Sequence, residues 1–143
     1  MKRVYRFFAL ILTFVFIASI TIGCSASRNP QKMSPGRAFT SFMENMRQGN
    51  YSEAAQFVSL RTAAENQAEL PTFLAWVAKE QDLDKITGFE VLDEKMDGSK
   101  AVVKVRLTAN ISGKEHSNEA EFPMFKEDGI WKLYLDSYGY PRE

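Results

Sequence analysis

Residues 100–112 carry the strongest structural signal in the sequence, because apolar and polar side chains alternate along them. Alanine, valine, leucine or isoleucine occupies every odd position from Ala101 to Ile111, whereas most even positions are polar or charged. Successive side chains of a strand point to opposite faces, so this period of two predicts a β-strand with one buried face. A lone strand is not stable, and the rest of the chain must supply strands beside it and a layer over its apolar face.

Three further segments have the composition of strands: residues 86–95 before this one, and residues 115–126 and 130–136 after it. Short turns that contain glycine separate the four segments, which favours antiparallel hairpins. We therefore expect a four-stranded antiparallel β-meander.

Two-residue turns at 113–114 and 128–129 would set the pairing of the last three strands. They place apolar side chains opposite one another: Val105 with Phe122, Val103 with Met124, Leu107 with Ala120, Met124 with Leu133, and Phe122 with Leu135. The other face then pairs Arg106 with Glu121. A slip of one residue would move these side chains to the wrong face, so the pattern constrains the register.

The first hairpin leaves two alternatives. A three-residue turn at 97–99 with a bulge pairs Val91 with Val105 and keeps Glu90 on the polar face. A two-residue turn would instead put Glu90 opposite Val105, on the apolar face. We favour the three-residue turn.

Before residue 82 the apolar period is that of a helix. We expect helices at residues 37–48, 52–59 and 62–69, the second capped by Ser52, and a fourth that begins at Pro71 and ends near residue 81. The expected apolar stripes are Phe39, Phe42, Met43 and Met46 on the first helix, and Phe73, Leu74 and Val77, with Trp76 beside them, on the last.

Helices first and an antiparallel meander after them predict an α+β fold, with the helices packed on one face of the sheet. The chain divides into residues 1–23 as a signal segment, residues 24–34 as a flexible tether, and residues 35–143 as one domain.

The N-terminus has the pattern of a secretion signal. Lys2, Arg3 and Arg6 precede an apolar run from residue 7 to about residue 22, and Gly23 lies at the expected cleavage position. The run is somewhat shorter than the roughly 20 residues that a membrane-spanning helix needs. An uncleaved N-terminal anchor is the alternative.

Residues 20–24, ITIGC, resemble the lipobox of bacterial lipoproteins, with Thr21 where the pattern usually has leucine. The resemblance implies cleavage between Gly23 and Cys24, a diacylglycerol on the Cys24 thiol, and an extracytoplasmic place in the bacterial cell envelope. Two acyl chains hold a protein at a bilayer, where a single chain binds only marginally. Since Ser25 and not aspartate follows the cysteine, the resemblance implies the outer membrane if the host has one.

Composition argues against several classes of chemistry. Three of the 18 basic residues leave with the signal, so 15 basic residues face 18 acidic ones and no basic surface for nucleic acid is expected. Cys24 is the only cysteine and His116 the only histidine, which excludes a disulfide within the chain and a histidine zinc cluster. We expect no cofactor, no bound metal and no catalytic residue.

Three runs of turn and core residues carry a further resemblance: GNYSEAA at 49–55, DGSKAVV at 97–103 and FKEDGIWKL at 125–133. Together with the order of the elements, they resemble small bacterial lipoproteins of unknown function with a nuclear-transport-factor-like (cystatin-like α+β) domain. The resemblance implies a cone-shaped domain in which a curved sheet wraps a long helix and often leaves a pocket. Some members of that superfamily are isomerases or dehydratases, and others bind or dimerise.

A pocket between helices and sheet would be lined by apolar side chains and one carboxylate. The candidate lining is Phe39, Phe42, Met46, Phe73, Trp76, Glu90, Val105, Phe122 and Leu133. We favour a domain that binds a partner protein or a small apolar ligand. The alternative is an isomerase-like or dehydratase-like enzyme that uses a single pocket carboxylate, for which Glu90 is the candidate.

The polar face of the sheet is the candidate surface for a protein contact. Its expected side chains are Lys104, Arg106, Thr108, Glu119, Glu121, Phe125 and Tyr134. In the resembled superfamily such a face often pairs with a second copy, so a homodimer or another protein partner is expected there.

Overall fold

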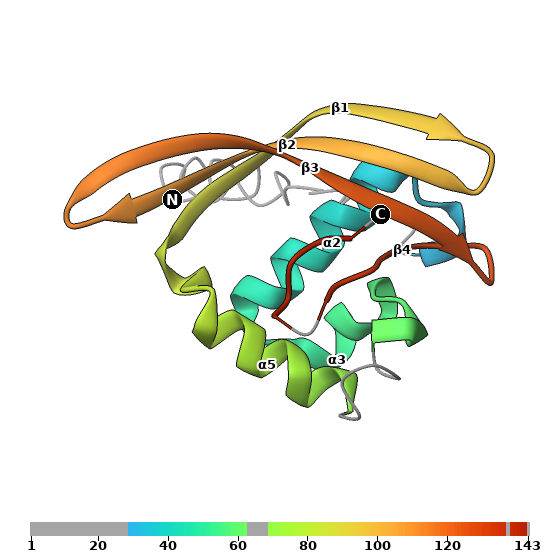
Figure 1. Ribbon diagram of the computed structural model, residues 1–143, viewed down its shortest axis with the longest axis horizontal. Helices are drawn as coiled ribbons and strands as arrows, with labels where there is room; N and C mark the ends of the chain where they lie inside the picture. The colour runs from blue at the N-terminus through green and yellow to red at the C-terminus, as the bar shows by residue number, and fades with distance from the viewer. Residues whose placement is uncertain (1–28, 63–68, 137, 143) are drawn as a thin grey trace, which may run out of the picture.

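In the computed structural model, which describes residues 29–62, 69–136 and 138–142, a curved sheet lies over a layer of helices (Figure 1). The strands follow one another in the order β1-β2-β3-β4, each antiparallel to the next. The expected α+β class, with helices on one face of an antiparallel meander, is confirmed. The expected signal segment lies outside the described residues. In the part of the chain that is described, no helix has the length and apolar character to cross a membrane.

Helix α2 (Pro35–Gln48) matches the first predicted helix and begins two residues earlier. The Ser34 side chain caps its first turn, and Gly49, in the left-handed conformation at a φ of 74°, ends it. A carboxylate of the sheet binds the same N-terminus: Glu94 Oε2 accepts hydrogen bonds from the Gly36 N–H at 2.7 Å and from the Ser34 hydroxyl at 3.0 Å. The long helix is thereby fixed to the first strand.

The segment after α2 contains less helix than its sequence predicts. Helix α3 (Tyr51–Ala54) includes Ser52 in its first turn, so Ser52 is not its cap, and only a 3₁₀ turn, η2 (Ala55–Phe57), continues it. The chain leaves the helix here because the Ser59 N–H donates to the Leu133 carbonyl at 2.7 Å. Pairing with the last strand therefore outweighs the local helix pattern.

The helix expected at 62–69 falls largely outside the described residues. Thr62 is fully buried, and its hydroxyl donates to the Leu135 carbonyl at 3.2 Å and accepts from the Leu135 N–H at 3.1 Å. Helix α5 (Leu70–Glu80) then has Pro71 in its first turn, as predicted. Its buried side chains are Phe73, Leu74 and Val77.

After the short turn η3 (Leu83–Lys85) the chain enters the sheet. The strands are β1 (Ile86–Asp97), β2 (Lys100–Ile111), β3 (Lys114–Glu127) and β4 (Ile130–Leu133). Met124 lies opposite Leu133, as the turn at 128–129 predicts.

The pairing of β2 with β3 differs from the prediction by two residues. The turn consists of Ser112 and Gly113, one position earlier than expected, with φ values of 53° and 78°. Two successive left-handed residues form the tight turn that matches the twist of paired strands. Arg106 therefore lies opposite Glu119 and not Glu121. The pairs on the apolar face become Ala101 with Met124, Val103 with Phe122, Val105 with Ala120 and Leu107 with Asn118. Because the shift is two residues, every side chain keeps its predicted face.

The first hairpin combines the two alternatives. Its turn has two residues, 98–99, so the expected three-residue turn is wrong. A bulge between Val91 and Asp93 takes up the extra residue, and Val91 still pairs with Val105 as predicted. Glu90 consequently lies on the outer face of the sheet, away from the helices.

Pro123 ends the pairing of β3 with β4, and the expected pair of Phe122 with Leu135 does not form. The next hydrogen-bonded pair would join Pro123 to Tyr134, but proline has no N–H to donate. The Tyr134 carbonyl instead accepts from the Arg142 N–H at 2.9 Å. The C-terminal tail, residues 138–142, thus pairs with the chain that follows β4.

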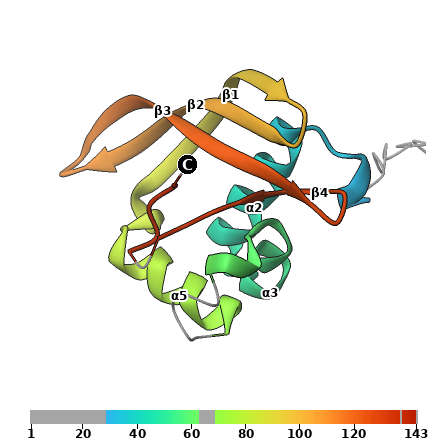
Figure 2. The ribbon, with the colours of Figure 1, turned by 45° about the vertical axis from the view of Figure 1, so that its right-hand side comes forward.

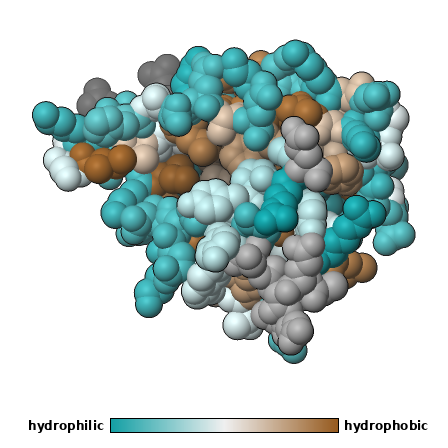
Figure 3. Space-filling model, viewed as in Figure 1, coloured by the Kyte–Doolittle hydropathy of each residue, from teal (hydrophilic) through white to brown (hydrophobic). Residues whose placement is uncertain are grey.

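The core lies between α2 and the concave face of the sheet (Figure 2). The fully buried ring of Phe39 lies 4.6 Å from the ring of Phe122 and 6.4 Å from that of Phe89, measured between centroids. Other fully buried side chains are Val58, Leu74, Val103, Val105, Met124 and Leu133. In the space-filling view, apolar side chains gather between the sheet and the helices, with hydrophilic ones around them (Figure 3).

Candidate functional site

Most side chains expected to line an inner pocket belong to the hydrophobic core. Six are buried, namely Phe39, Phe42, Met46, Phe73, Val105 and Leu133, and Phe122 is partly buried against them. Two lie elsewhere. Trp76 is 42% exposed and stacks on Phe73 at 6.0 Å, and the Glu90 side chain is 65% exposed on the outer face. The other seven residues belong to the hydrophobic core or pack against it.

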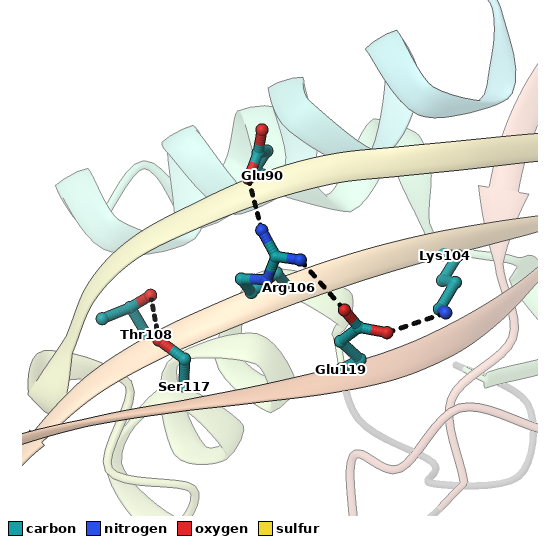
Figure 4. Close-up of polar contacts among 6 residues, drawn as sticks. All are labelled: Glu90, Lys104, Arg106, Thr108, Ser117 and Glu119. Carbon is teal, nitrogen blue, oxygen red and sulfur yellow. Dashed lines mark hydrogen bonds and ion pairs between the residues drawn. The ribbon is translucent and has the colours of Figure 1, made fainter.

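On the outer face, a series of ion pairs crosses three strands (Figure 4). Arg106 on β2 lies between two carboxylates, with Nη1 3.1 Å from Glu90 Oε2 on β1 and Nη2 3.0 Å from Glu119 Oε1 on β3. The other oxygen of Glu119 lies 2.7 Å from Lys104 Nζ. The Arg106 guanidinium contacts a carboxylate on each side, so positive and negative groups alternate across this face.

These contacts change how the charged groups ionise. The hydrogen bond from Lys104, followed by that from Arg106, lowers the pKa of Glu119 below its ordinary value. The hydrogen bond to Glu119 raises the pKa of Lys104. Both groups are therefore charged at neutral pH, but water screens them, so they order the surface more than they stabilise the fold. The hydroxyls of Thr108 and Ser117, 3.0 Å apart, extend the same polar row.

Beside the ion pairs, the outer face contains a cleft of about 490 Å³. Val102, Pro123 and Phe125, on β2 and β3, form its apolar floor. The other apolar residues that line it are Met96, Ala101, Met124 and Pro141 of the C-terminal tail. The charged residues around the floor are Lys95, Asp97, Lys100 and Glu121. A volume of this size is within the range of small-molecule sites, which span roughly 300–1,000 Å³. The cleft can bind an apolar group at its centre and charged groups at its rim.

The alternation in the sequence did not lead to this cleft, although a signal was present. Val102 is the one apolar residue at an even position of 100–112, and it faces outward while its neighbours face the core. Pro123 and Phe125 break the polar pattern on β3 in the same way. An apolar patch on the supposedly polar face was therefore readable, but the contribution of Pro141 was not.

The C-terminal tail is held near the cleft by Asp136. Asp136 Oδ1 accepts hydrogen bonds from the backbone N–H groups of Tyr138 and Tyr140, each at 2.9 Å. Asp136 Oδ2 lies 3.6 Å from Arg142 Nε. Partial burial by itself would raise the pKa of Asp136. The two N–H donors and the Arg142 charge outweigh it, so the pKa lies below its ordinary value.

The outer face is equipped for binding by contact and charge. In the described part of the chain, no three histidine, cysteine, aspartate or glutamate side chains are grouped so that they could hold a metal ion. His116 is exposed on β3, opposite Ala109 and away from the cleft. Asp97 and Glu121, which line the cleft, are also exposed to water.

No protein-family model matches the chain, and no curated protein matches it in sequence. Among solved structures, it is similar to a SEC-C motif-containing protein from Rhodopseudomonas palustris, with 16% identity, a TM-score of 0.54, and 69% of this chain and 73% of that chain covered. An NTF-2-like protein of unknown function from Shewanella oneidensis overlaps with a TM-score of 0.48 and 15% identity, over 67% of this chain and 88% of that chain. An uncharacterised cystatin-fold protein from Novosphingobium aromaticivorans gives a TM-score of 0.44 and 8% identity, over 70% and 94%. At these identities the likeness concerns the fold alone.

Proposed function

We propose that the protein is a lipoprotein of the bacterial cell envelope whose domain binds a protein partner through the outer face of its sheet. A diacylglycerol on Cys24, exposed by cleavage after Gly23, holds it outside the cytoplasm. The observation that carries the binding role is the cleft of about 490 Å³ next to a row of ion pairs on one face.

The two faces of the sheet differ in what they leave available. The concave face packs against α2 through fully buried side chains such as Phe39 and Val105. The outer face has apolar residues in a cleft, with Val102 38% exposed. Apolar groups at the centre of a surface, with charges around them, form the pattern of a protein interface. Binding at the outer face therefore requires no opening of the core.

A second copy of the chain is the partner that the charges favour. The outer face has both signs in similar numbers: Lys95, Lys100, Lys104 and Arg106 against Glu90, Asp97, Glu119 and Glu121. A two-fold interface brings the same patch of both copies together, and a patch with balanced charge can complement itself.

A small apolar ligand in the same cleft is the second candidate, because the cleft has an apolar floor and the volume of a ligand site. The single-carboxylate enzyme receives no support from Glu90, the residue considered for it. Glu90 is paired with Arg106 on the outer face and is not placed among apolar side chains.

Replacing Val102 with arginine tests the proposed interface. A charge in the cleft floor should weaken self-association by about tenfold or more, since about 1.4 kcal/mol corresponds to a factor of ten. The matched control is Leu60→Arg, which makes the same kind of change at a residue 64% exposed outside the sheet. Sedimentation of the detergent-extracted protein should show dimers for the wild type and the control, and monomers for Val102→Arg.

A wild type that sediments as a monomer at high concentration would remove the support for a second copy. A photo-crosslinker at position 102, used in intact membranes, then separates the remaining cases. Crosslinking to a different protein would keep the outer face as the interface, and no crosslinked product would refute a protein contact there.

A further inference from the structure

Three segments that are far apart in the sequence meet where the described chain begins. The 3₁₀ turn η1 (Pro30–Lys32) packs against β4, and a Cβ on Gly129 would lie 3.7 Å from Gln31 Cγ. The β1–β2 turn joins the same end, because the Lys126 N–H donates to the Ser99 carbonyl at 2.8 Å. Figures 1 and 2 both show the first, blue segment on the side of these two turns. We call this end, made of residues 30–32, 95–100 and 126–129, the tether-proximal end.

The tether-proximal end is more basic than the opposite end of the domain. Its basic residues are Lys32, Lys95, Lys100 and Lys126, against the carboxylates of Asp97, Glu127 and Asp128. One of these carboxylates, Glu127, is half-buried and accepts a hydrogen bond from the Ser59 hydroxyl at 2.8 Å. The opposite end, residues 69–85, has Lys79 and Lys85 against Glu69, Glu80, Asp82 and Asp84. The charge is therefore distributed unevenly along the molecule.

An exposed apolar side chain accompanies these lysines. Met96, next to the β1–β2 turn, is 61% exposed. Lys95 and Lys100 lie on either side of that turn, and neither forms an ion pair within the described residues. Free lysines around a protruding apolar residue match an anionic bilayer surface, where the charges meet headgroups and the methionine meets the acyl boundary.

The number of residues between Cys24 and the described chain limits how far this end can be from the membrane. Cys24 precedes Asn29, the first described residue, by five positions. At roughly 3.3–3.6 Å per residue, five residues span at most about 18 Å. The lipid proposed on Cys24 would therefore keep the tether-proximal end close to the headgroups.

We infer that the tether-proximal end is a membrane-docking surface, with Lys95 and Lys100 against anionic headgroups and Met96 at the interface. This inference rests on the proposed lipid anchor and adds an orientation to it. The β2–β3 turn then lies farthest from the bilayer, because β2, with 12 residues at about 3.3 Å each, spans roughly 40 Å. Lys95, Met96 and Lys100 also line one side of the outer-face cleft. A docked bilayer therefore covers that side, and the part of the outer face around Arg106 and Glu119 remains accessible to a partner.

The test uses the full chain, extracted from bacterial membranes and reconstituted into phosphatidylglycerol–phosphatidylcholine vesicles that contain spin-labelled lipid. A fluorophore is attached to Met96→Cys in one sample and to Ile111→Cys in the other. Ile111, 51% exposed beside the β2–β3 turn, is the matched control at the far end of the same strand. We expect the spin-labelled lipid to quench the fluorophore at position 96 strongly. The fluorophore at position 111 should be quenched no more than the same fluorophore free in buffer.

Charge reversal tests the lysines separately. Each lysine near an anionic surface contributes about fivefold to binding at low salt, so Lys95→Glu with Lys100→Glu should reduce quenching at position 96. Two outcomes would overturn the docking surface: equal quenching at positions 96 and 111, or no quenching at position 96. If the mass of the chain includes the diacylglycerol, either outcome leaves the anchor intact. Quenching that the double reversal does not change would overturn the role of the lysines. A mass without the diacylglycerol would overturn the anchor and the docking surface together.

Discussion

Replacing Phe39 with alanine tests whether the space between α2 and the sheet is a packed core. The Phe39 ring is fully buried and lies against Phe122 at 4.6 Å and Phe89 at 6.4 Å. Removing a fully buried aromatic ring costs the transfer free energy of its atoms and leaves a cavity, together about 3–5 kcal/mol. A domain of this size is stabilised by only about 5–15 kcal/mol, so the variant should lose a large part of its stability.

Urea unfolding followed by tryptophan fluorescence measures this loss, since Trp131 is buried in the same core. With an m-value of roughly 1.5 kcal/mol/M, the urea midpoint should fall by about 2–3 M. The matched control is Tyr138→Ala, which removes an aromatic ring that is 64% exposed and should change the free energy of unfolding by at most about 0.5 kcal/mol. A loss below about 1 kcal/mol for Phe39→Ala would refute the packed core. The side chains around α2 would then line a cavity, such as a ligand site, and would not form a packed core.

Three further predictions concern the contacts that hold the domain's edges. Glu94→Ala should lower the free energy of unfolding by about 1–3 kcal/mol, because the Gly36 N–H loses its charged acceptor; the same urea titration measures it. Gly139→Ala should release the C-terminal tail, since a Cβ there would lie 2.6 Å from Val77 Cγ1 at a φ of 83°, and hydrogen exchange of the tail amides should become faster. The pKa of Asp136 is lowered in the folded state, so its stabilising effect is complete above the ordinary aspartate pKa of about 4 and is lost as the pH falls through the lower folded value. The wild type should therefore lose stability more steeply than Asp136→Asn below about pH 4, as measured by urea midpoints at each pH.

The elements with a strong periodic pattern could be predicted from the sequence. Four apolar residues on one stripe, with Ser34 before them and Gly49 after them, determined α2. The alternation in residues 100–112 determined which side chains of β2 are buried. In both cases local preference and the needs of the core agree, so the local signal is sufficient.

The predictions failed where one more or one fewer residue in a turn or a bulge changes the pairing register of neighbouring strands. The Ser112–Gly113 turn shifts the pairing of β2 with β3 by two residues from the prediction. The bulge between Val91 and Asp93 compensates for the shorter turn between β1 and β2, so that Val91 still pairs with Val105. Neither is visible in the alternation, because a shift of two keeps every face and a bulge is local. The early end of β4 could have been predicted, since Pro123 lacks the N–H that a longer ladder needs.

The candidate site was predictable only in part. The charged outer face was expected from the polar positions of β2 and β3. The cleft depends in addition on Pro141, which reaches it through the tail that Asp136 holds. Contacts of this kind join segments with no shared periodicity, and a single sequence contains no signal for them.

The mass of the intact protein, extracted from bacterial membranes, tests the lipid anchor most directly. We predict a chain that begins at Cys24, lacks residues 1–23 and has the added mass of a diacylglycerol. The Cys24→Ser chain should carry neither the cleavage nor the lipid. A membrane-extracted wild type whose mass is that of the unmodified full-length chain would contradict the proposed lipoprotein.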